Sequence, residues 1–455
     1  MKPAVRKLMG RRSFFQSLGA AAGASAAAAW VTDEDLEATL QNVNTRSKPS
    51  QLQITDLRVA VVAKAPMTCP LIRIDTNQGL TGYGEVRDGA SETYALMLKS
   101  RILGENPCNV DKVFRKLKQF GHHARQAGGV CAVEMACWDL AGKAYGVPAY
   151  QMLGGLFRDR VRLYADTTEA PNARAQGLKL KERMDRGITF LKQDFGINLL
   201  RTVPGTLSKP LGMPYSGGDR VMHPFTGIEI TDKGIAYLSD YIGEIRSIVG
   251  MEIPLSSDHY GHIGVNSCIR LARAMEKHQL AWMEDMVPWQ FGHLMKEIKD
   301  AVDVPILTGE DIYLKEDFIK LIDMGAVDMI HPDLASSGGL LETKKIGDYA
   351  MERGVAMAMH FAGTPVSFLA NVHCAAATEN FLCLEHHSMD VAWWETMIEP
   401  KVAIEKGHAV VPDRPGLGFD SLNEEVVKAH LLPGSGYFDP TPQWDKQRSN
   451  DRLWS

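Results

Sequence analysis

Apolar and polar residues alternate in a region of the chain that begins near residue 54. The alternation predicts two half-buried strands, and regularly placed glycines mark a third: residues 57–62, 71–75 and 79–84. A helical period follows over residues 91–119 and 128–145. Strands followed by helices predict an α+β domain in this part of the chain.

Further along, short apolar runs alternate with helical stretches. Eight of these runs are candidate strands: residues 161–168, 189–195, 252–260, 280–286, 304–310, 329–334, 355–361 and 381–386. Strands that alternate with helices favour a parallel sheet, and eight of them suit a closed barrel. We therefore predict a modified TIM barrel of the (β/α)₇β type with an α+β capping domain. The length of 455 residues suits a barrel plus a smaller second domain.

This interpretation divides the chain into five segments. They are a leader at residues 1–30, a linker at 31–50, the N-terminal part of the cap at 51–160, the barrel at 161–395, and a C-terminal segment at 396–455 that packs back on the cap. One interval between strand ends is long: Asp194 and Asp258 lie 64 positions apart, whereas Asp258 and Glu284 lie 26 apart. The excess, residues 204–227, is rich in Gly, Pro and Ser, and it is a candidate lid or, alternatively, a surface or oligomer-contact loop.

Three acids close successive barrel strands at equal spacing. Asp258, Glu284 and Glu310 each follow a short apolar run, and each step is 26 positions. Acids at the same place in three successive βα units converge only if the strands are parallel and closed into a barrel. Converging carboxylates repel one another unless a cation lies between them, and an all-oxygen donor set favours Mg²⁺. The spacing therefore predicts a metal site together with the fold.

Other polar residues end the remaining strands. Asp333 and His360 end adjacent strands, so the carboxylate can hold the imidazole tautomer and raise its basicity. Lys192 and Asp194 are two positions apart on the second strand and face the same side, and Glu385 ends the eighth strand. The carboxyl ends of the strands are where barrel enzymes keep their chemistry. Four further histidines are interpreted as ordinary core residues: His259, His331, His386 and His387.

From about residue 52 to 440 the chain resembles the enolase superfamily, in the mandelate racemase/muconate lactonizing enzyme group. The resemblance is carried by the segment Val133-Glu-Met-Ala-Cys-Trp-Asp139, by Thr308-Gly-Glu310, by Pro332-Asp333 with Gly338-Gly339, and by the 27-position step from Asp333 to His360. It implies that Asp258, Glu284 and Glu310 bind Mg²⁺ and that His360 with Asp333 is a general base. It also implies that Lys192 polarises the substrate carboxylate and that Glu385 hydrogen-bonds this carboxylate and its enediolate.

One departure from the family pattern bears on the reaction. The family often has Lys-x-Lys on the second strand, with the second Lys as a base, but this chain has Lys192-Gln193-Asp194. Asp is a far weaker base than Lys, which disfavours a reaction that needs a base on each face of the carbon, although Asp194 could still shuttle a proton or hold a hydroxyl. We therefore predict dehydration of a sugar acid to a 2-keto-3-deoxy acid. An epimerase, racemase or cycloisomerase, and more distantly a non-catalytic sugar-acid binder, remain alternatives.

Dehydration also needs an acid for the leaving hydroxyl group. The candidates are Tyr260, two positions after the first metal ligand, and His360 acting as both base and acid, followed by His262 in the next loop, which is also a possible substrate contact. Arg87 in the cap is a possible substrate contact, and an exposed salt bridge is its more ordinary interpretation.

The first thirty residues have the pattern of an export signal. Arg11 and Arg12 precede an apolar, Ala-rich stretch at residues 18–29, which indicates the twin-arginine route, although a chance Arg-Arg pair is the alternative. The net charge of −5 offers no basic field for nucleic acid, and the seven cysteines form no CxxC pair. We expect a periplasmic protein, soluble after export, that acts on a small carboxylate and forms a homo-oligomer.

Overall fold

The computed structural model describes residues 48–208, 227–258 and 263–447 of the chain. The expected leader, Tyr260 and His262 lie outside these residues, and so does most of the long insert. The described ends of the insert form two short antiparallel strands, β6 (Leu207–Ser208) and β7 (Glu229–Ile230).

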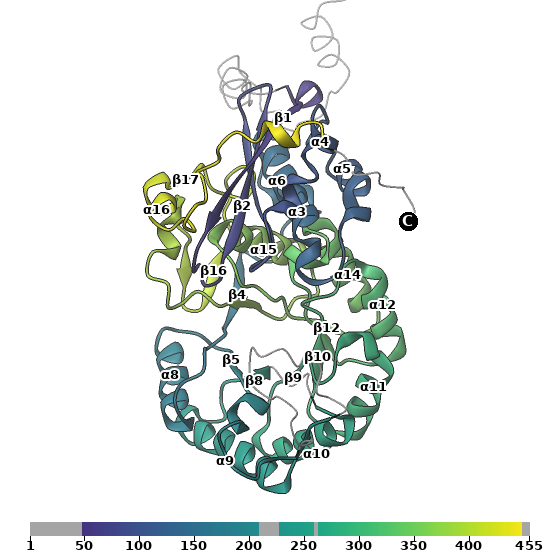
Figure 1. Ribbon diagram of the computed structural model, residues 1–455, viewed down its shortest axis with the longest axis vertical. Coiled ribbons are helices and arrows are strands. Elements are labelled where there is room, and N and C mark those ends of the chain that lie inside the picture. The colour runs from purple at the N-terminus through teal and green to yellow at the C-terminus, as the bar shows by residue number, and fades with distance from the viewer. Residues whose placement is uncertain (1–47, 209–226, 259–262, 448–455) are drawn as a thin grey trace, which may run out of the picture. The chain divides into compact units, whose positions relative to one another are not determined.

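An antiparallel sheet and several helices form the cap (Figure 1). The sheet has the order β1-β2-β3, and the main cap elements are β1 (Ile54–Val62), β2 (Cys69–Thr76), β3 (Thr81–Glu85), α3 (Thr93–Leu96), α4 (Lys99–Ile102), α5 (Val110–Leu117) and α6 (Gly128–Tyr145). Helix α6 is buried along most of its length and packs against β3. A Cβ atom at Gly84 would lie 2.0 Å from the carbonyl oxygen of Ala132, so glycine in β3 is what lets the strand and helix approach so closely.

Eight strands form the parallel sheet of the barrel. They are β4 (Arg160–Ala165), β5 (Leu191–Asp194), β8 (Leu255–Asp258), β9 (Met283–Glu284), β10 (Ile306–Thr308), β11 (Met329–Ile330), β12 (Ala356–Met357) and β13 (Leu384–His386). Neighbours pair in parallel from β4 to β12, β13 pairs in parallel with β4, and a bridge from Met359 to Leu384 closes the ring. The predicted fold class is confirmed. Most of the strands are shorter than predicted, at one or both ends: β9, for example, covers Met283–Glu284, whereas residues 280–286 were expected.

A helix follows each of the first seven barrel strands, and Figure 1 shows the helices labelled α8 to α12 on the outside of the strands. The seven are α8 (Ala173–Asp185), α9 (Asp232–Val249), α10 (Val265–Met275), α11 (Gly292–Ala301), α12 (Lys315–Met324), α14 (Leu340–Glu352) and α15 (Pro365–Ala377), with the short α13 (Leu334–Ser337) before α14. None of these or the other helices in the described ranges has the length and hydrophobicity needed to cross a bilayer.

Two buried cap carboxylates bind the N-termini of barrel helices. Glu134 of α6 accepts a hydrogen bond of 2.8 Å from the backbone N–H of Leu340, the first residue of α14. Glu85 at the end of β3 accepts backbone N–H groups of Thr364 at 3.0 Å and Ser367 at 3.3 Å, at the start of α15. Helix N-termini carry unpaired N–H groups, and these contacts satisfy some of them, so they fix the cap over the barrel.

The C-terminal segment returns to both domains. Strand β16 (His408–Val410) pairs antiparallel with the first half of β4. Further on, the backbone N–H of Leu432 donates to Val61 at 2.8 Å and that of Phe438 donates to Val59 at 3.1 Å, both in cap strand β1.

Candidate active site

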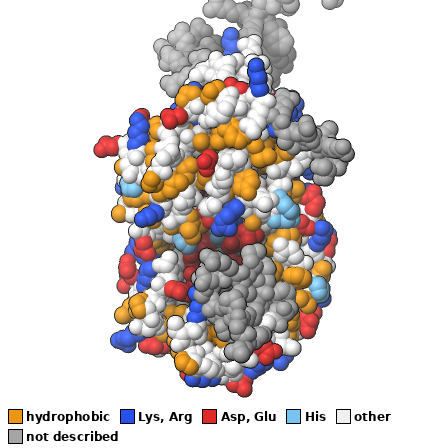
Figure 2. Space-filling view, in the orientation of Figure 1, with side chains coloured by type: hydrophobic (Ala, Val, Ile, Leu, Met, Phe, Trp, Pro, Cys, Tyr) orange, Lys and Arg blue, Asp and Glu red, His pale blue; other side chains and the backbone are white. Residues whose placement is uncertain are grey.

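The three equally spaced acids lie together at the carboxyl end of the barrel. Asp258 ends β8, Glu284 ends β9, and Glu310 follows β10 by two residues. Carboxylate oxygens of Asp258 and Glu284 lie within 4.8 Å of each other, and so do oxygens of Glu284 and Glu310. Figure 2 shows acidic side chains gathered in a hollow midway along one face of the molecule. The register of the parallel strands thus brings the acids together, as their spacing predicts.

Lys192 provides the central positive charge of this group. Its ammonium nitrogen lies 2.8 Å from Asp258 Oδ2, 3.2 Å from Glu284 Oε2 and 3.3 Å from Glu385 Oε1. Burial alone would lower the pKa of Lys192, but the surrounding carboxylates raise it well above its ordinary value, so the side chain stays charged. Asp194 lies two residues further along β5, and the register places it beside Asp258.

His360 and Asp333 form a buried pair. Nδ1 of His360 lies 2.6 Å from Oδ2 of Asp333, and its Nε2 lies 3.1 Å from Oε2 of Glu310. Burial alone would lower the pKa of His360, but the charges of Glu310 and Glu385 raise it to about 10. A cation held by Glu310 would oppose this rise, because a positive charge beside an imidazole disfavours its protonated form.

Glu385 is held by a residue that sequence reasoning missed. The hydroxyl group of Tyr164 in β4 donates to Glu385 Oε2 at 2.7 Å and lies 2.6 Å from Nε2 of His331. Burial raises the pKa of Tyr164 well above its ordinary value, so the hydroxyl keeps its proton. His331 is fully buried, as expected of a core histidine. Tyr164 occupies an inward position of the first barrel strand, and that alternation was the available signal.

Arg87 does not form an exposed salt bridge, contrary to its more ordinary interpretation. Its side chain is 1% exposed, and its Nε donates to Asp88 at 2.6 Å. Its Nη1 donates to the carbonyl oxygen of Glu310 at 2.8 Å and to Ser336 Oγ at 2.7 Å, and lies 3.3 Å from Asp333 Oδ2. The loop after β3 inserts the guanidinium between the cap and the barrel, where it holds protein groups of the site.

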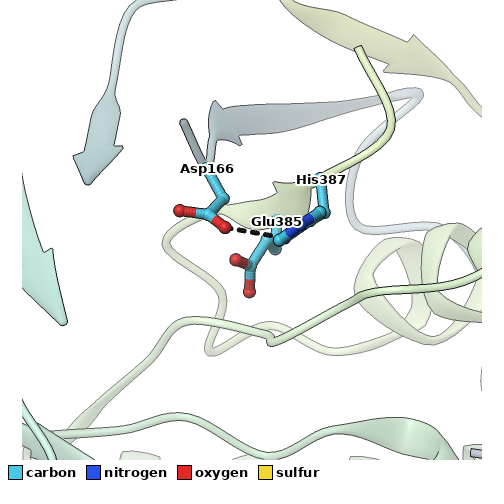
Figure 3. A group of neighbouring side chains, drawn as sticks. All are labelled: Asp166, Glu385 and His387. Carbon is cyan, nitrogen blue, oxygen red and sulfur yellow. Dashed lines mark ion pairs between the residues drawn. The ribbon is translucent and has the colours of Figure 1, made fainter. Parts of the chain in front are cut away.

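A second histidine–aspartate pair lies at the ends of β4 and β13 (Figure 3). Nδ1 of His387 lies 2.6 Å from Oδ2 of Asp166, and Glu385 lies beside them. His386 is buried against Phe368, as expected of a core histidine, but His387 points the other way, with 15% of its side chain exposed. Its position two residues after Glu385 was the signal for this placement, because alternate strand residues share a face.

The residues present fit a hard divalent cation. The nearby donors are carboxylate oxygens, including one of Asp285, together with one nitrogen of His331, and such an oxygen-rich set suits Mg²⁺. Buried Glu284 Oε1 receives no hydrogen bond, and His331 Nδ1 lies 2.7 Å away. Burial and the charge of Asp258 raise the pKa of Glu284 to about 8. A cation at this position would bind the unpaired oxygen and remove the repulsion between the acids.

A capped parallel barrel with acids, a lysine and a histidine–aspartate pair at its carboxyl end defines an enolase-type enzyme fold. Residues 36–154 match the mandelate racemase / muconate lactonizing enzyme N-terminal domain, and residues 181–426 match a domain described as enolase C-terminal domain-like. The chain therefore belongs to the enolase superfamily, in the mandelate racemase/muconate lactonizing enzyme group. Enzymes of this superfamily use divalent metal ions in catalysis.

Known relatives align over most of the chain. A D-xylonate dehydratase from Haloferax volcanii is 32% identical over 421 residues, which are 90% of this chain and 96% of the relative. An arabinonate dehydratase from Saccharolobus solfataricus is 26% identical and covers 81% of this chain and 93% of its own length. A solved mandelate racemase/muconate lactonizing enzyme-like protein from Rubrobacter xylanophilus superposes with a TM-score of 0.75 at 29% identity, covering 86% of this chain and all of its own.

Proposed function

We propose that this protein is a Mg²⁺-dependent acid-sugar dehydratase that converts a sugar acid to a 2-keto-3-deoxy acid. The observation that carries the proposal is that the site has one strong base. His360 is paired with Asp333, but strand β5 has Asp194 at the position where a racemase or epimerase would need a second lysine as its other base. One strong base suits proton removal followed by loss of water. Relatives named D-xylonate and arabinonate dehydratase support the same reaction class.

The chain's own residues can bind the substrate and remove its proton. Lys192 is placed to hold the substrate carboxylate, and Glu385, 3.3 Å from Lys192 and oriented by Tyr164, donates a hydrogen bond to it when it carries a proton. Nε2 of His360 takes the proton from C2, while Asp333 holds Nδ1 and stabilises the imidazolium that forms. The charge of Lys192 stabilises the negative charge that develops on the substrate carboxylate.

The metal ligands in this proposal are Asp258, Glu284 and Glu310, and the ion is Mg²⁺. When bound, Mg²⁺ supplies Lewis-acid stabilisation of the doubly negative enediolate. Activity should disappear after dialysis against a chelator and return with Mg²⁺, and binding of Mg²⁺ should weaken in Glu284→Gln.

A screen of mono- and diacid sugars with Mg²⁺ tests the reaction. The product of dehydration is a 2-keto acid that reacts with semicarbazide, whereas an epimerase, the alternative reaction, only exchanges the C2 proton in heavy water. His360→Asn should abolish both signals, and it is the matched control for a contaminating activity. Tight binding without turnover of any acid, with Mg²⁺ bound, would instead identify a non-catalytic sugar-acid binder.

We also propose export by the twin-arginine route to the periplasm and assembly into a homo-oligomer. Arg11 and Arg12 before an Ala-rich stretch support export, and the exposed apolar side chains of Leu156 and Phe157 support a contact between copies. Cell fractionation should find the unaltered protein in the periplasm and a variant with both arginines changed to lysine in the cytoplasm. Light scattering after size-exclusion chromatography measures the number of copies.

A further inference from the structure

The second histidine–aspartate pair is built into the barrel in the same way as the first. Strands β13 and β4 pair in parallel, with Glu385 opposite Tyr164 and His386 opposite Ala165. The next pair in this register is His387 and Asp166, one residue beyond the strand ends. Because alternate residues of a strand share a face, His387 lies on the same side as Glu385, one layer closer to the opening of the barrel (Figure 3).

Asp166 fixes the orientation of the His387 ring. Oδ1 of Asp166 accepts the backbone N–H of Thr167 at 2.9 Å, which leaves Oδ2 for His387 Nδ1 at 2.6 Å. The same distance joins Nδ1 of His360 to Asp333. In both pairs the aspartate holds Nδ1, so Nε2 is the nitrogen left to exchange a proton with another molecule.

The geometry of the pair favours a hydrogen bond over a metal site. One possible metal-ligand atom from each of three residues lies within 4.8 Å of the others: these residues are Asp166, Glu385 and His387. Two ligand atoms each about 2.1 Å from one small octahedral ion would lie about 3 Å apart. The observed 2.6 Å is shorter than this and matches a charge-assisted hydrogen bond.

The surroundings of His387 favour its protonated form. Burial alone would lower its pKa, but the hydrogen bond and charge of Asp166 raise it, Glu385 adds to the rise, and the charge of His360 opposes it. An imidazolium that keeps 15% of its side chain exposed can give a proton to a bound molecule, whereas His331, which is fully buried, has no such access.

Both histidines lie close to Glu385. Nε2 of His360 lies 3.7 Å from Glu385 Oε2, and His387 reaches the same carboxylate from the neighbouring layer. A substrate carboxylate held by Lys192 and Glu385 would therefore lie near both histidines. A dehydratase needs one group that accepts the C2 proton and one that protonates the leaving hydroxyl, and this arrangement supplies both.

We propose that His387, held by Asp166, is the general acid that protonates the leaving C3 hydroxyl group, an inference that rests on the proposed dehydratase function. His360 takes the proton from C2, and the electron pair of that C–H bond forms a C2–C3 double bond. The C3–O bond breaks with its electrons on oxygen, and the proton of His387 completes a water molecule. The enol that remains tautomerises to the 2-keto acid, and exchange with solvent restores both histidines.

Comparing two leaving groups, water and fluoride, tests whether His387 acts as a general acid or has only a structural role. The unaltered enzyme and His387→Gln are compared on the sugar acid that the enzyme dehydrates and on its 3-deoxy-3-fluoro analogue, from which fluoride leaves without needing a proton. In His387→Gln we expect kcat for water loss to fall about 10²–10⁴-fold while fluoride release stays within a few-fold of the unaltered enzyme. His360→Asn should lose both reactions, because both need the C2 proton removed.

Further measurements guard the interpretation. Asp166→Asn should shift the alkaline limb of the pH profile for water loss toward lower pH, because His387 loses the charge that favours its proton. His408→Gln, in β16 at the other end of β4, is the matched control and should leave both reactions unchanged. Exchange of the C2 proton in heavy water should persist in His387→Gln.

The possible outcomes are distinguishable. Equal losses of water and fluoride elimination in His387→Gln would overturn the assignment of the acid while leaving the dehydratase function standing. A second equivalent of bound Mg²⁺ that disappears in His387→Gln would also overturn it, in favour of a metal site. Absence of 2-keto acid from the unaltered enzyme on every sugar acid would overturn the proposed function and this assignment with it.

Discussion

Replacing Arg87 with methionine should destabilise the protein and its active site together. The guanidinium is 1% exposed and holds Asp88 at 2.6 Å, Asp333 at 3.3 Å and the backbone carbonyl of Glu310 at 2.8 Å. Methionine fills similar space but leaves buried carboxylates without their counter-charge. Breaking a buried ion pair by removing one partner costs about 3–5 kcal/mol, and we expect a loss of this size in the free energy of unfolding.

Arg125 provides an internal control, because it binds the same carboxylate from the surface. Its Nη2 lies 3.0 Å from Asp88 Oδ2, but the side chain is 46% exposed. Exposed ion pairs contribute only about 0–1 kcal/mol, so Arg125→Met should change stability little. The two arginines thus share Asp88 as a partner and differ in how deeply they are buried.

Urea unfolding followed by circular dichroism, with the unaltered protein and its variants measured side by side, gives the comparison. Arg87→Met should move the midpoint several-fold further than Arg125→Met, and it should also lower kcat because Asp333 is then less firmly held. Arg87→Lys keeps the charge but loses the planar fork of donors, so it should fall between the unaltered protein and Arg87→Met. Equal midpoint shifts for Arg87→Met and Arg125→Met would refute the argument from burial.

Three other changes have definite expected results. His360→Asn should lower kcat for 2-keto acid formation about 10²–10⁴-fold, and an active variant would exclude His360 as the base. Burial raises the pKa of Glu85 to about 8 from the ordinary 4.5, so its proton stabilises the fold fully below pH 4.5 and ceases to do so as the pH rises through 8. As the pH rises from about 5 to about 8, the free energy of unfolding should therefore fall less in Glu85→Gln than in the unaltered protein, as measured by urea titrations. An equal fall in both proteins would contradict this. In Gly84→Ala the added Cβ would lie 2.0 Å from the carbonyl oxygen of Ala132, so thermal unfolding should show a loss of about 1–3 kcal/mol, and an unchanged melting temperature would mean that β3 and α6 can separate at little cost.

Much of the barrel was predictable because its pattern is local. Each strand is a short apolar run, and each is followed by a helical stretch, so all eight strands were found at their places in the chain. Their ends were less well predicted: the seventh was expected over residues 355–361, and β12 covers Ala356–Met357. The domain limits, the role of the long insert and the leader stay predictions, since the insert and leader fall largely outside the described residues.

The candidate site also has a part that the sequence predicts and a part that it does not. The equal spacing of Asp258, Glu284 and Glu310 predicts their convergence, because parallel strands in a barrel bring equivalent positions to one end. The same reasoning could not find Arg87, whose contact with Glu310 joins residues 223 positions apart in different domains. No period in the sequence relates a cap loop to a strand end.

The second histidine shows where sequence reasoning stops. Residue 387 could be seen to share a face with Glu385, but an apolar run ending in histidines is more often a core feature than a catalytic one. Its partner, Asp166, comes from the first barrel strand, and only closure of the ring sets the two side by side at 2.6 Å.

By itself, the sequence determined the repeating strands, the convergence of the three acids and the pairing of His360 with Asp333, because each depends on spacing within a repeat. The tertiary structure decided which charges compensate one another: Arg87 is buried against the site, Tyr164 holds Glu385, and Asp166 orients His387. Such pairings depend on distances of about 3 Å between side chains far apart in the chain, and only the packed fold sets those distances.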